Sequence, residues 1–530
     1  MKAVLVAFVI GTLALTGCTT EDERGTAQQS ALPRDMGTCL VRGNLGLMAC
    51  DVLQHHLHGT RDGLYTDPLI TQAAATSTRR DTTFSAPLPG PTYAQPLHVT
   101  GGPGGRAAFI AVTEQNAVLA LDAASGAQLW VRILGTPVPR SQLPCGNIDP
   151  LGITGTPVID SIARIIYVAA MTTPDGGGTK QQRIFALALD DGSTLPGWPL
   201  DVSGMSYKGL VFNSTVQHQR SALLLNAGIV YVAYGAHTGD CGVYHGWVIA
   251  VPVNNPTRAT AWATEARGGG MWAPGGLATD GTSIFAATGN TFGASTWMGG
   301  EAILRLGPGA TFSGLPADYF TPSNWPLLDA ADSDLGGSGP LVLDVPGATP
   351  SQLVIALGKN GVAYVLDRTH LGGLGTGDGV MGEGVQSRQV ASGAIINAAA
   401  AYTAAAGTYV VFNTNGSGVG CPGTPGSLVA LSIGATAPPT ITVAWCANNL
   451  GSGSPMVTTT DGRSDPVVWS IGAESSNQLH AFHGETGAVL FAGGGAADQM
   501  SFVRRFQTPI AVNGRIFVAA DNELYAFTTQ

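Results

Sequence analysis

The chain has 530 residues, of which 44% are hydrophobic and only 11% are charged, and its formal net charge is −10 at pH 7. This acidic balance, without Lys/Arg clusters interleaved with aromatic residues, excludes nucleic acid as a partner. The 74 glycines and 32 prolines divide the chain into short apolar runs, a composition typical of many short strands joined by turns.

The N-terminus predicts export and lipidation. An apolar run over residues 3–15 is too short to span a bilayer, but it suits a signal peptide at 1–17. The segment LTGC that ends at Cys18 resembles a bacterial lipobox and implies that Cys18 carries the lipid. Thr19, where an aspartate would favour the inner membrane, favours the outer membrane or the cell surface. The alternative is a plain signal peptide with a chance cysteine.

Six cysteines follow Cys18, an even number that predicts three disulfides in an oxidising compartment. Six thiols allow 15 pairings. Proximity in the sequence favours two pairs and leaves the remaining two cysteines for each other, which gives Cys39–Cys50, Cys421–Cys446 and Cys145–Cys241. The alternative is that some of these thiols are free and buried. No Cys-x-x-Cys-His motif occurs, so no covalent haem is expected.

A polar segment over residues 18–50 is interpreted as a tether and N-terminal segment, and one unit then repeats through residues 51–530. The fullest copy, AAFIAVTEQNAVLALDAASGAQLWVRIL, begins at Ala107, and we count eight units. Apolar residues alternate or run between Gly, Asn and Asp in each unit, as in hairpins of short strands. Such a unit is hydrophobic on both faces and must stack on its neighbours. The repeat therefore predicts an all-β, eight-bladed β-propeller of four-stranded antiparallel blades.

The ends of the repeat predict how the ring closes. The last unit stops at Gln530 without the outer strand that LWVRIL provides in the first copy. The segment near 82–89, which contains TTFSAPLP, precedes the first copy and alternates suitably. We expect this segment to pair with the final blade, since closure removes an exposed sheet edge. The alternative is an open solenoid with capped ends.

Several stretches resemble the pyrroloquinoline-quinone (PQQ) type β-propeller repeat. They include FIAVTEQNAVLALDAASGAQLW, CGNIDPLGITGTPVID, GGGMWAPGGLATD and DYFTPSNWPLLDAADSDLGGSGPLVL. The resemblance covers nearly everything after about residue 51 and is closest to bacterial exported proteins. Propellers of this type serve as quinoprotein dehydrogenases and also as non-catalytic scaffolds.

The resemblance to quinoprotein alcohol dehydrogenases implies roles for five residues. Trp272 of GGGMW matches the aromatic floor under PQQ, and Lys359 of GKNGVAYVLDR matches the cation at the quinone carbonyls. Asp334 of DSDLGGSG matches the catalytic base. Asn290 of ATGN matches a Ca²⁺ ligand, and Asp240 of TGDCGVYHGW stands for the metal-binding carboxylate. These roles are physically coherent, because a planar anion needs a stacking surface and a hard cation needs oxygen ligands.

Each of these residues also has a purely structural interpretation. Trp272 can pack between blades, and Asn290 and Asp334 are common turn residues. Lys359 precedes Asn-Gly, which is typical of a hairpin tip. Two further features depart from the dehydrogenases that the chain resembles. No two cysteines are adjacent, so the Cys-Cys roof over PQQ is missing, and Ser333 replaces the tryptophan before the catalytic aspartate.

The sequence therefore supports two hypotheses of function. The first is a lipid-anchored scaffold of the cell envelope, with its propeller in the periplasm or outside, that binds a small molecule or an envelope protein. The alternative is a PQQ- and Ca²⁺-dependent dehydrogenase that oxidises an alcohol or a sugar. The histidines in LQHHLHG, which are His55, His56 and His58, are interpreted as structural or solvated, because no Cys, Asp or Glu stands at metal-ligand spacing. No nucleophile elbow or phosphate-binding loop is present.

Overall fold

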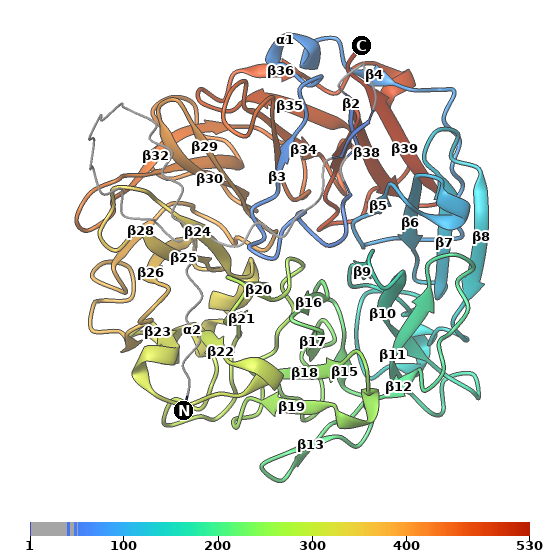
Figure 1. Ribbon diagram of the computed structural model, residues 1–530. Helices are drawn as coiled ribbons and strands as arrows, with labels where there is room; N and C mark the ends of the chain where they lie inside the picture. Colours follow the sequence, from blue (N-terminus) through green and yellow to red (C-terminus); the bar gives the residue numbers. More distant parts are fainter. Residues whose placement is uncertain (2–39, 43–46, 50) are drawn as a thin grey trace. The chain divides into compact units, whose positions relative to one another are not determined.

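The ring of sheets confirms the predicted fold. The computed structural model describes residues 51–530, the backbone of 40–42 and 47–49, and Met1. Its strands form eight mainly antiparallel sheets around a common centre, one for each sequence unit (Figure 1). The protein is thus an all-β, eight-bladed β-propeller. The predicted lipidation site Cys18 and the predicted pair Cys39–Cys50 lie outside the described residues.

The first four sheets follow one another along the chain. The first contains β5 (Leu97–Val99), β6 (Ala108–Val112), β7 (Ala117–Asp122) and β8 (Gln128–Ile133). The second contains β9 (Val158–Asp160), β10 (Ile165–Thr172), β11 (Gln181–Ala188) and β12 (Leu200–Asp201). The third contains β15 (Gln217–His218), β16 (Leu224–Asn226), β17 (Ile229–Ala236), β18 (Trp247–Pro252) and β19 (Thr260–Ala263). The fourth contains β20 (Ala278–Thr279), β21 (Ile284–Ala287), β22 (Ile303–Leu306), β23 (Tyr319–Thr321) and β27 (Gly373–Leu374).

The last four sheets complete the ring, and two of them include a strand from the N-terminal region. The fifth contains β24 (Leu341–Asp344), β25 (Gln352–Leu357), β26 (Val362–Asp367) and β28 (Gln386–Gln389). The sixth contains β29 (Ala400–Ala404), β30 (Gly407–Asn413), β31 (Leu428–Ile433) and β32 (Ile441–Ala447). The seventh contains β3 (Leu64–Thr66), β33 (Met456–Thr459), β34 (Val467–Ile471), β35 (Leu479–His483) and β36 (Val489–Phe491). The eighth contains β37 (Ile510–Val512), β38 (Arg515–Ala520), β39 (Glu523–Thr528) and β4 (Arg79–Arg80).

The remaining elements are short. Two small hairpins pair β1 (Leu40–Arg42) with β2 (Leu47–Ala49), and β13 (Ser206–Tyr207) with β14 (Leu210–Val211). The α-helices are α1 (Gln72–Ala75) and α2 (Trp325–Ala331). Single 3₁₀ turns occur at Pro103–Gly105, Arg140–Gln142, Pro256–Arg258, Pro308–Ala310, Pro316–Asp318, Leu335–Gly337 and Ala496–Asp498. Among the described residues, no helix is long and apolar enough to cross a membrane.

The core lies between adjacent sheets, because alternate residues of a strand face opposite neighbours. On β7, Val118 and Ala120 belong to the apolar cluster shared with the second sheet. The intervening residue Leu119 belongs to the cluster shared with the eighth sheet. Every residue from Ala117 to Leu121 is buried. Both faces of β7 are therefore apolar, as expected for a sheet that packs between two neighbouring sheets of the ring.

Residues 52–67 form a segment that we call the inner belt, which passes through the middle of the ring (Figure 1). Its backbone or side chains hydrogen-bond to residues that lie in, or directly next to, strands of all eight sheets. The contacts are made by Val52 with His98, Leu53 with Ile159, Arg61 with Leu223, Gly59 with Thr279, Thr60 with Val342, Asp62 with Ala401, Gly63 with Val457 and Asp67 with Gly514. His55 and His56 are buried in this belt, and their rings stack 4.4 Å apart. The belt thus ties the sheets together from the inside.

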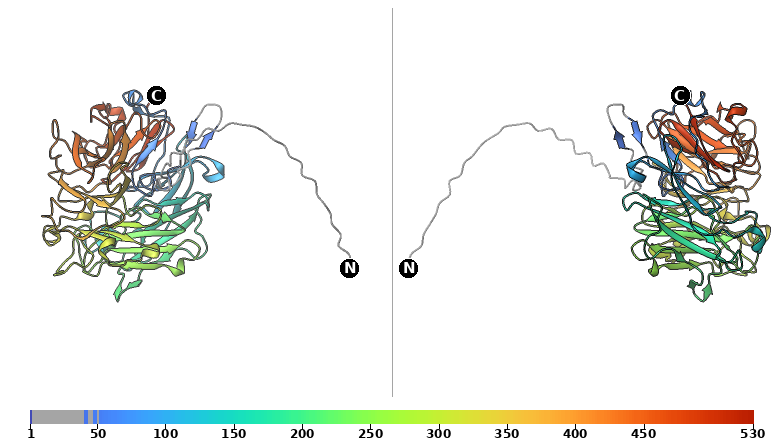
Figure 2. Two further views of the ribbon diagram at one scale, coloured as in Figure 1. Left: turned by 60° about the vertical axis from the view of Figure 1, so that its left-hand side comes forward. Right: turned by 90° about the vertical axis from the view of Figure 1, so that its right-hand side faces the viewer.

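The chain closes the ring by pairing residues before the first sheet with the last strand. The pairing strand is β4, where Arg80 lies opposite Phe527 of β39. The predicted segment 82–89 continues along the same edge, because Leu88 N donates to Asn522 O at 2.9 Å and Leu524 N donates to Ala86 O at 2.9 Å. In the views of Figures 1 and 2, the blue N-terminal strands and the red C-terminal strands lie side by side at this junction. The last sheet is therefore completed by residues that precede the first sheet in the chain.

Candidate functional site

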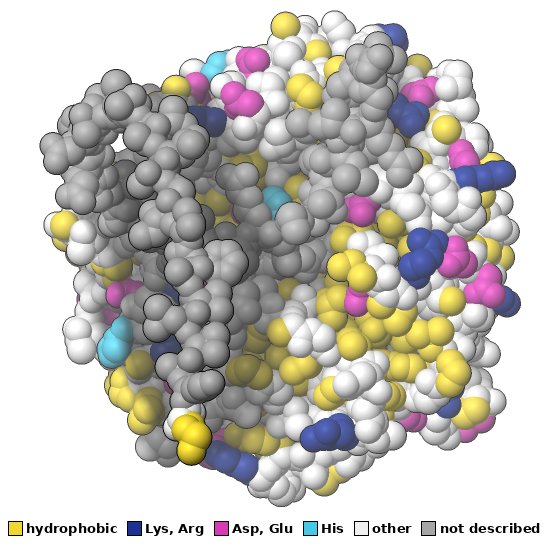
Figure 3. All heavy atoms as spheres, in the orientation of Figure 1, with side chains coloured by type: hydrophobic (Ala, Val, Ile, Leu, Met, Phe, Trp, Pro, Cys, Tyr) yellow, Lys and Arg dark blue, Asp and Glu magenta, His cyan; other side chains and the backbone are white. Residues whose placement is uncertain are grey.

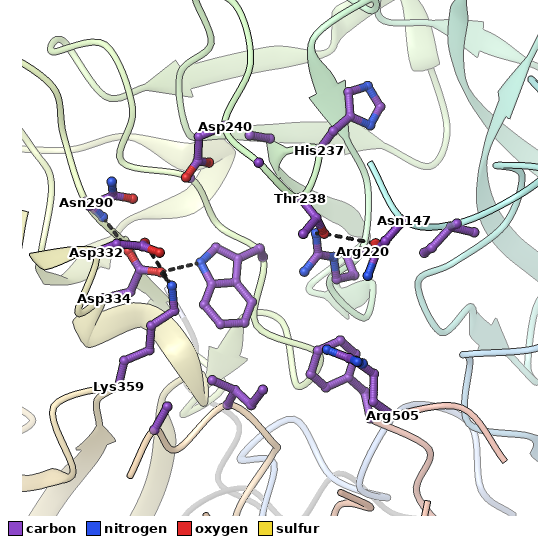
Figure 4. Close-up of a pocket in the computed structure, with 18 of the residues that line it drawn as sticks. Asn147, Arg220, His237, Thr238, Asp240, Asn290, Asp332, Asp334, Lys359 and Arg505 are labelled. Atoms are coloured by element: carbon purple, nitrogen blue, oxygen red, sulfur yellow. Dashed lines mark hydrogen bonds and ion pairs between the residues drawn. The ribbon is translucent and has the colours of Figure 1, made fainter. Parts of the chain in front are cut away.

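All five residues assigned by resemblance line one cavity of about 380 Å³, which we call the main cavity (Figure 4). They come from the loops of three successive sheets. Asp240 follows β17, Trp272 precedes β20, Asn290 follows β21, Asp334 follows α2, and Lys359 connects β25 to β26. Such a volume is in the range of sites for small ligands. The fold therefore gathers residues that are up to 119 positions apart in the sequence.

The carboxylate of Asp334 is the centre of this group. Its side chain is only 2% exposed. Asp334 Oδ1 accepts a hydrogen bond from the backbone N–H of Asn290 at 2.7 Å, and Oδ2 accepts one from Trp272 Nε1 at 3.1 Å. Lys359 Nζ lies 2.6 Å from the same Oδ2. Both oxygens of this buried carboxylate are thus held in a fixed orientation.

The close contact between Asp334 and Asn290 depends on a glycine. A Cβ atom placed on Gly289 would lie 2.5 Å from Asp334 Oδ1. Any other residue at this position would push the carboxylate away from the backbone N–H that binds it. The sequence ATGN therefore places a glycine where the geometry needs one.

Lys359 bridges two carboxylates beside the indole ring. Its Nζ atom lies 2.9 Å from Asp332 Oδ1 as well as close to Asp334. The same Nζ lies 5.1 Å from the centroid of the Trp272 ring. Burial alone would lower the pKa of Lys359, but the charges and hydrogen bonds of Asp334 and Asp332 raise it. Lys359 therefore stays protonated and places a positive charge in the cavity.

Asp240 and Asn290 bring further oxygen atoms to the cavity. Asp240 Oδ1 accepts a hydrogen bond from the Tyr244 hydroxyl at 2.8 Å. Burial raises the pKa of Asp240, and the negative charges of Asp334 and Asp332 raise it further. Within the described part of the chain, Asp240 Oδ2 and the side-chain amide of Asn290 make no hydrogen bond. Carboxylate and amide oxygens of this kind are the ligands that Ca²⁺ prefers.

Arg220 is a cavity residue that the sequence analysis missed. Its guanidinium lies 5.6 Å from the centroid of Trp272. Its Nη2 makes a long contact of 3.4 Å with Thr238 Oγ1, and its buried Nε has no hydrogen-bond partner. Among residues 51–530, no carboxylate forms an ion pair with it, and burial lowers its pKa to about 10. A half-buried guanidinium whose charge no described carboxylate neutralises attracts anions, so this part of the cavity favours an anionic ligand.

Two disulfides are present among the described residues. Cys145–Cys241, with Cα atoms 6.2 Å apart, joins the loop of Asn147 to the loop of Asp240, both of which line the cavity. Cys421–Cys446 has Cα atoms 5.7 Å apart and lies in the sixth sheet. Both pairs are those that the sequence favoured. The first one fixes two walls of the main cavity against each other.

The histidine-rich segment LQHHLHG contributes to the belt and not to this cavity. His58 Nδ1 lies 2.8 Å from Asp62 Oδ1. Burial lowers the pKa of His56 to about 4, so its ring is neutral at physiological pH. In the part of the chain that the structure describes, no three His, Cys, Asp or Glu side chains gather as metal ligands do.

Charge is dispersed over the visible face of the molecule. Figure 3 shows Lys and Arg side chains that are scattered singly there, often beside Asp or Glu. Where grey atoms do not cover this face, positive and negative side chains are therefore mixed.

Four polar side chains interact in a chain that leads from the wall of the main cavity to the buried Glu114. His237 lines the cavity and stacks on His218 with ring centroids 5.6 Å apart. His218 Nε2 lies 3.1 Å from Thr154 Oγ1, which donates a hydrogen bond to Glu114 Oε1 at 2.8 Å. Glu114 is fully buried, and burial raises its pKa from 4.5 to about 7.

The raised pKa of Glu114 predicts a pH-dependent stability. The folded state retains a proton on Glu114 that the unfolded state loses above pH 4.5, so the contribution of Glu114 to the free energy of unfolding falls between about pH 4.5 and about pH 7, by about 3 kcal/mol. Glu114→Gln can accept from Gly152 N and donate to Thr154. We therefore expect the variant to lack this decrease and to be more stable than the wild type at about pH 8. Denaturant unfolding at about pH 5 and about pH 8 measures the difference, and parallel pH profiles would contradict the expectation.

Comparisons with known proteins support the fold. No protein-family model matches the sequence, and no curated protein matches it. The solved quinohemoprotein alcohol dehydrogenase ADHIIG from Pseudomonas putida HK5 is similar, with a TM-score of 0.63 and 13% identity over 90% of this chain and 80% of that chain. The quinohemoprotein alcohol dehydrogenase from Comamonas testosteroni has a TM-score of 0.59 and 15% identity over 90% and 80%. A europium-containing methanol dehydrogenase has a TM-score of 0.59 and 13% identity over 90% and 98%. The chain therefore has the PQQ-type propeller fold.

Proposed function

We propose that the main cavity binds PQQ and that the protein is a PQQ- and Ca²⁺-dependent dehydrogenase of an alcohol or a sugar. One observation carries this proposal: Trp272, Asn290, Asp334 and Lys359, which resemblance alone had selected, contact one another in a single cavity. A group of charged, polar and aromatic side chains that converge on one cavity is what a cofactor site requires.

The residues of the cavity fit the cofactor. PQQ is a planar anion, and the Trp272 ring offers a flat surface for it. The guanidinium of Arg220 and the ammonium of Lys359 lie 5.6 and 5.1 Å from the centroid of the Trp272 ring and offer the positive charge that carboxylates and quinone oxygens need. Bound PQQ would supply the acceptor for the two electrons that leave the substrate.

The donor set also fits Ca²⁺. Asp240 and Asn290 each have a side-chain oxygen free of hydrogen bonds within the described residues, on the same side of the cavity (Figure 4). A cation near these oxygens would also relieve the repulsion between Asp240, Asp332 and Asp334.

Asp334 would act as the base that accepts the proton of the substrate hydroxyl. Its orientation is fixed by the hydrogen bonds from Asn290 and Trp272, and the ammonium of Lys359 stabilises its negative charge. Because the carboxylate is buried, little water competes for it.

A second candidate is the scaffold, in which the cavity or the surrounding loops bind a small molecule or an envelope protein without catalysis. The observation that favours it is that both oxygens of Asp334 are already engaged within the protein. The sequence also has no adjacent Cys-Cys pair to cover PQQ, which likewise favours the scaffold.

The proposed location is outside the cytoplasm, with the lipid on Cys18 anchoring the propeller to the outer membrane or the cell surface. The disulfides Cys145–Cys241 and Cys421–Cys446 support an oxidising compartment.

Turnover distinguishes the two candidates. The full chain in detergent is loaded with PQQ and Ca²⁺, and reduction of an artificial electron acceptor is followed with alcohols and sugars. The dehydrogenase proposal predicts reduction that requires substrate, PQQ and Ca²⁺ together. PQQ binding without any substrate-dependent reduction would favour a non-catalytic binding role.

A further inference from the structure

A second hollow of about 390 Å³ adjoins the main cavity, and we call it the side hollow. The two share three wall residues, Ile396, Asn415 and Arg505. The other walls come from the loop between β30 and β31 and from the loop that leads to β33. In Figure 4, Arg505 lies across the main cavity from the Asp334 group. The binding surface therefore extends from the main cavity to the loops of the sixth and seventh sheets.

The walls of the side hollow are polar but electrically neutral. Side chains that line it include Thr414, Ser427 and Ser452, together with backbone at two glycines. The single lining charge, Arg505, is neutralised by Glu474, whose oxygens lie 2.7 to 3.0 Å from the guanidinium nitrogens. The hollow is therefore unlike the Arg220 side of the main cavity, because it offers no uncompensated charge to an anion.

Some of these polar groups are occupied within the protein and others are free. Thr414 Oγ1 donates to Gly393 O at 2.9 Å, and Ser427 Oγ accepts from Asn449 N at 3.3 Å. The side chains of Asn415 and Ser452 make no hydrogen bond to any described residue. Asn415 is exposed and Ser452 half-buried. One amide and one hydroxyl thus remain to bind a ligand, beside the apolar surface of Ile396.

We propose that the side hollow is a subsite for a neutral sugar ring, so that the substrate is a saccharide of at least two units. This inference rests on the proposed function: the hydroxyl to be oxidised lies near Asp334 and the next sugar ring lies in the side hollow. A sugar ring combines hydroxyls with apolar C–H groups, which matches free amide and hydroxyl groups next to an isoleucine. A simple alcohol would leave the hollow unused. The inference concerns binding and adds no chemical step.

Calorimetry with the full chain tests the subsite. The probes are maltose, cellobiose, maltotetraose and cellotetraose, with ethanol and glucose for comparison. We expect at least one of the four oligosaccharides to bind at least about tenfold more tightly than glucose. Ser452→Phe, which fills the hollow, should weaken this binding at least about tenfold and leave PQQ affinity unchanged. The control is Ser417→Phe, at an exposed serine of the loop between β30 and β31 that does not itself line the hollow.

The outcomes separate this inference from the proposed function. If none of the four oligosaccharides binds more tightly than glucose, or if Ser452→Phe binds them as the wild type does, the subsite is refuted even when PQQ binds. If oligosaccharides bind in a manner sensitive to Ser452→Phe but PQQ does not bind, the subsite stands and the dehydrogenase proposal fails.

Discussion

Arg61→Ala is expected to lower the free energy of unfolding by about 3 to 5 kcal/mol. Arg61 is 2% exposed in the inner belt, and it donates hydrogen bonds to the backbone oxygens of His55, Leu223 and Leu277 at 2.8 to 3.0 Å. Removing the guanidinium leaves three buried carbonyls without this donor and opens a cavity between the belt and two sheets. Guanidinium chloride unfolding followed by tryptophan fluorescence measures the loss.

Two further variants give this expectation its controls. Arg79→Ala removes an exposed arginine of β4, which like Arg61 precedes the first sheet. This substitution should change the free energy of unfolding by less than about 0.5 kcal/mol. Arg61→Lys keeps the positive charge but loses the planar guanidinium, so its free energy of unfolding should lie between those of the wild type and Arg61→Ala. Equal unfolding midpoints for Arg61→Ala and Arg79→Ala would show that the belt does not hold the ring together.

Asp334→Asn is expected to reduce turnover by about a hundredfold or more. The amide cannot accept the substrate proton, and its N–H₂ group would face two donors, Lys359 Nζ and Trp272 Nε1. The measurement is steady-state reduction of the artificial acceptor by the PQQ- and Ca²⁺-loaded protein, with PQQ affinity measured in parallel.

The matched control is Asp332→Asn. Asp332 pairs with the same Lys359, at 2.9 Å, but its side chain is 63% exposed. Solvent screens such a pair, so turnover should change by no more than about twofold. Turnover of Asp334→Asn close to that of the wild type would remove Asp334 from the role of base.

The fold was predictable because its signal is repeated. A two-residue apolar period bounded by Gly, Asn and Asp occurs in every unit, and stacking makes both faces of each sheet apolar. The closing strand was harder to place. Pro87 and Pro89 cannot donate to a ladder, so the regular pairing is at Arg79–Arg80 and the predicted segment 82–89 contributes only scattered hydrogen bonds.

The candidate site was predictable only in part. Trp272, Asn290, Asp334 and Lys359 stand in motifs, so resemblance could select them, and the fold brings them together. Arg220 lies in a stretch that also resembles the family, but the resemblance gave it no role, and what marks it is the absence of a counterion among residues 51–530. The inner belt has almost no strand pattern, because its hydrogen bonds go to eight different sheets and not to one partner strand. Local periodicity cannot report such contacts.

PQQ binding to the full chain, measured by calorimetry with and without Ca²⁺, tests the central claim most directly, with Trp272→Ala as the variant and Trp198→Ala as the control. Trp198 packs near Tyr167 with ring centroids 5.7 Å apart and does not line the cavity. The account predicts Ca²⁺-dependent binding that Trp272→Ala weakens at least about a hundredfold and Trp198→Ala leaves unchanged. No binding to the folded wild-type protein, or equal binding to both variants, would contradict it.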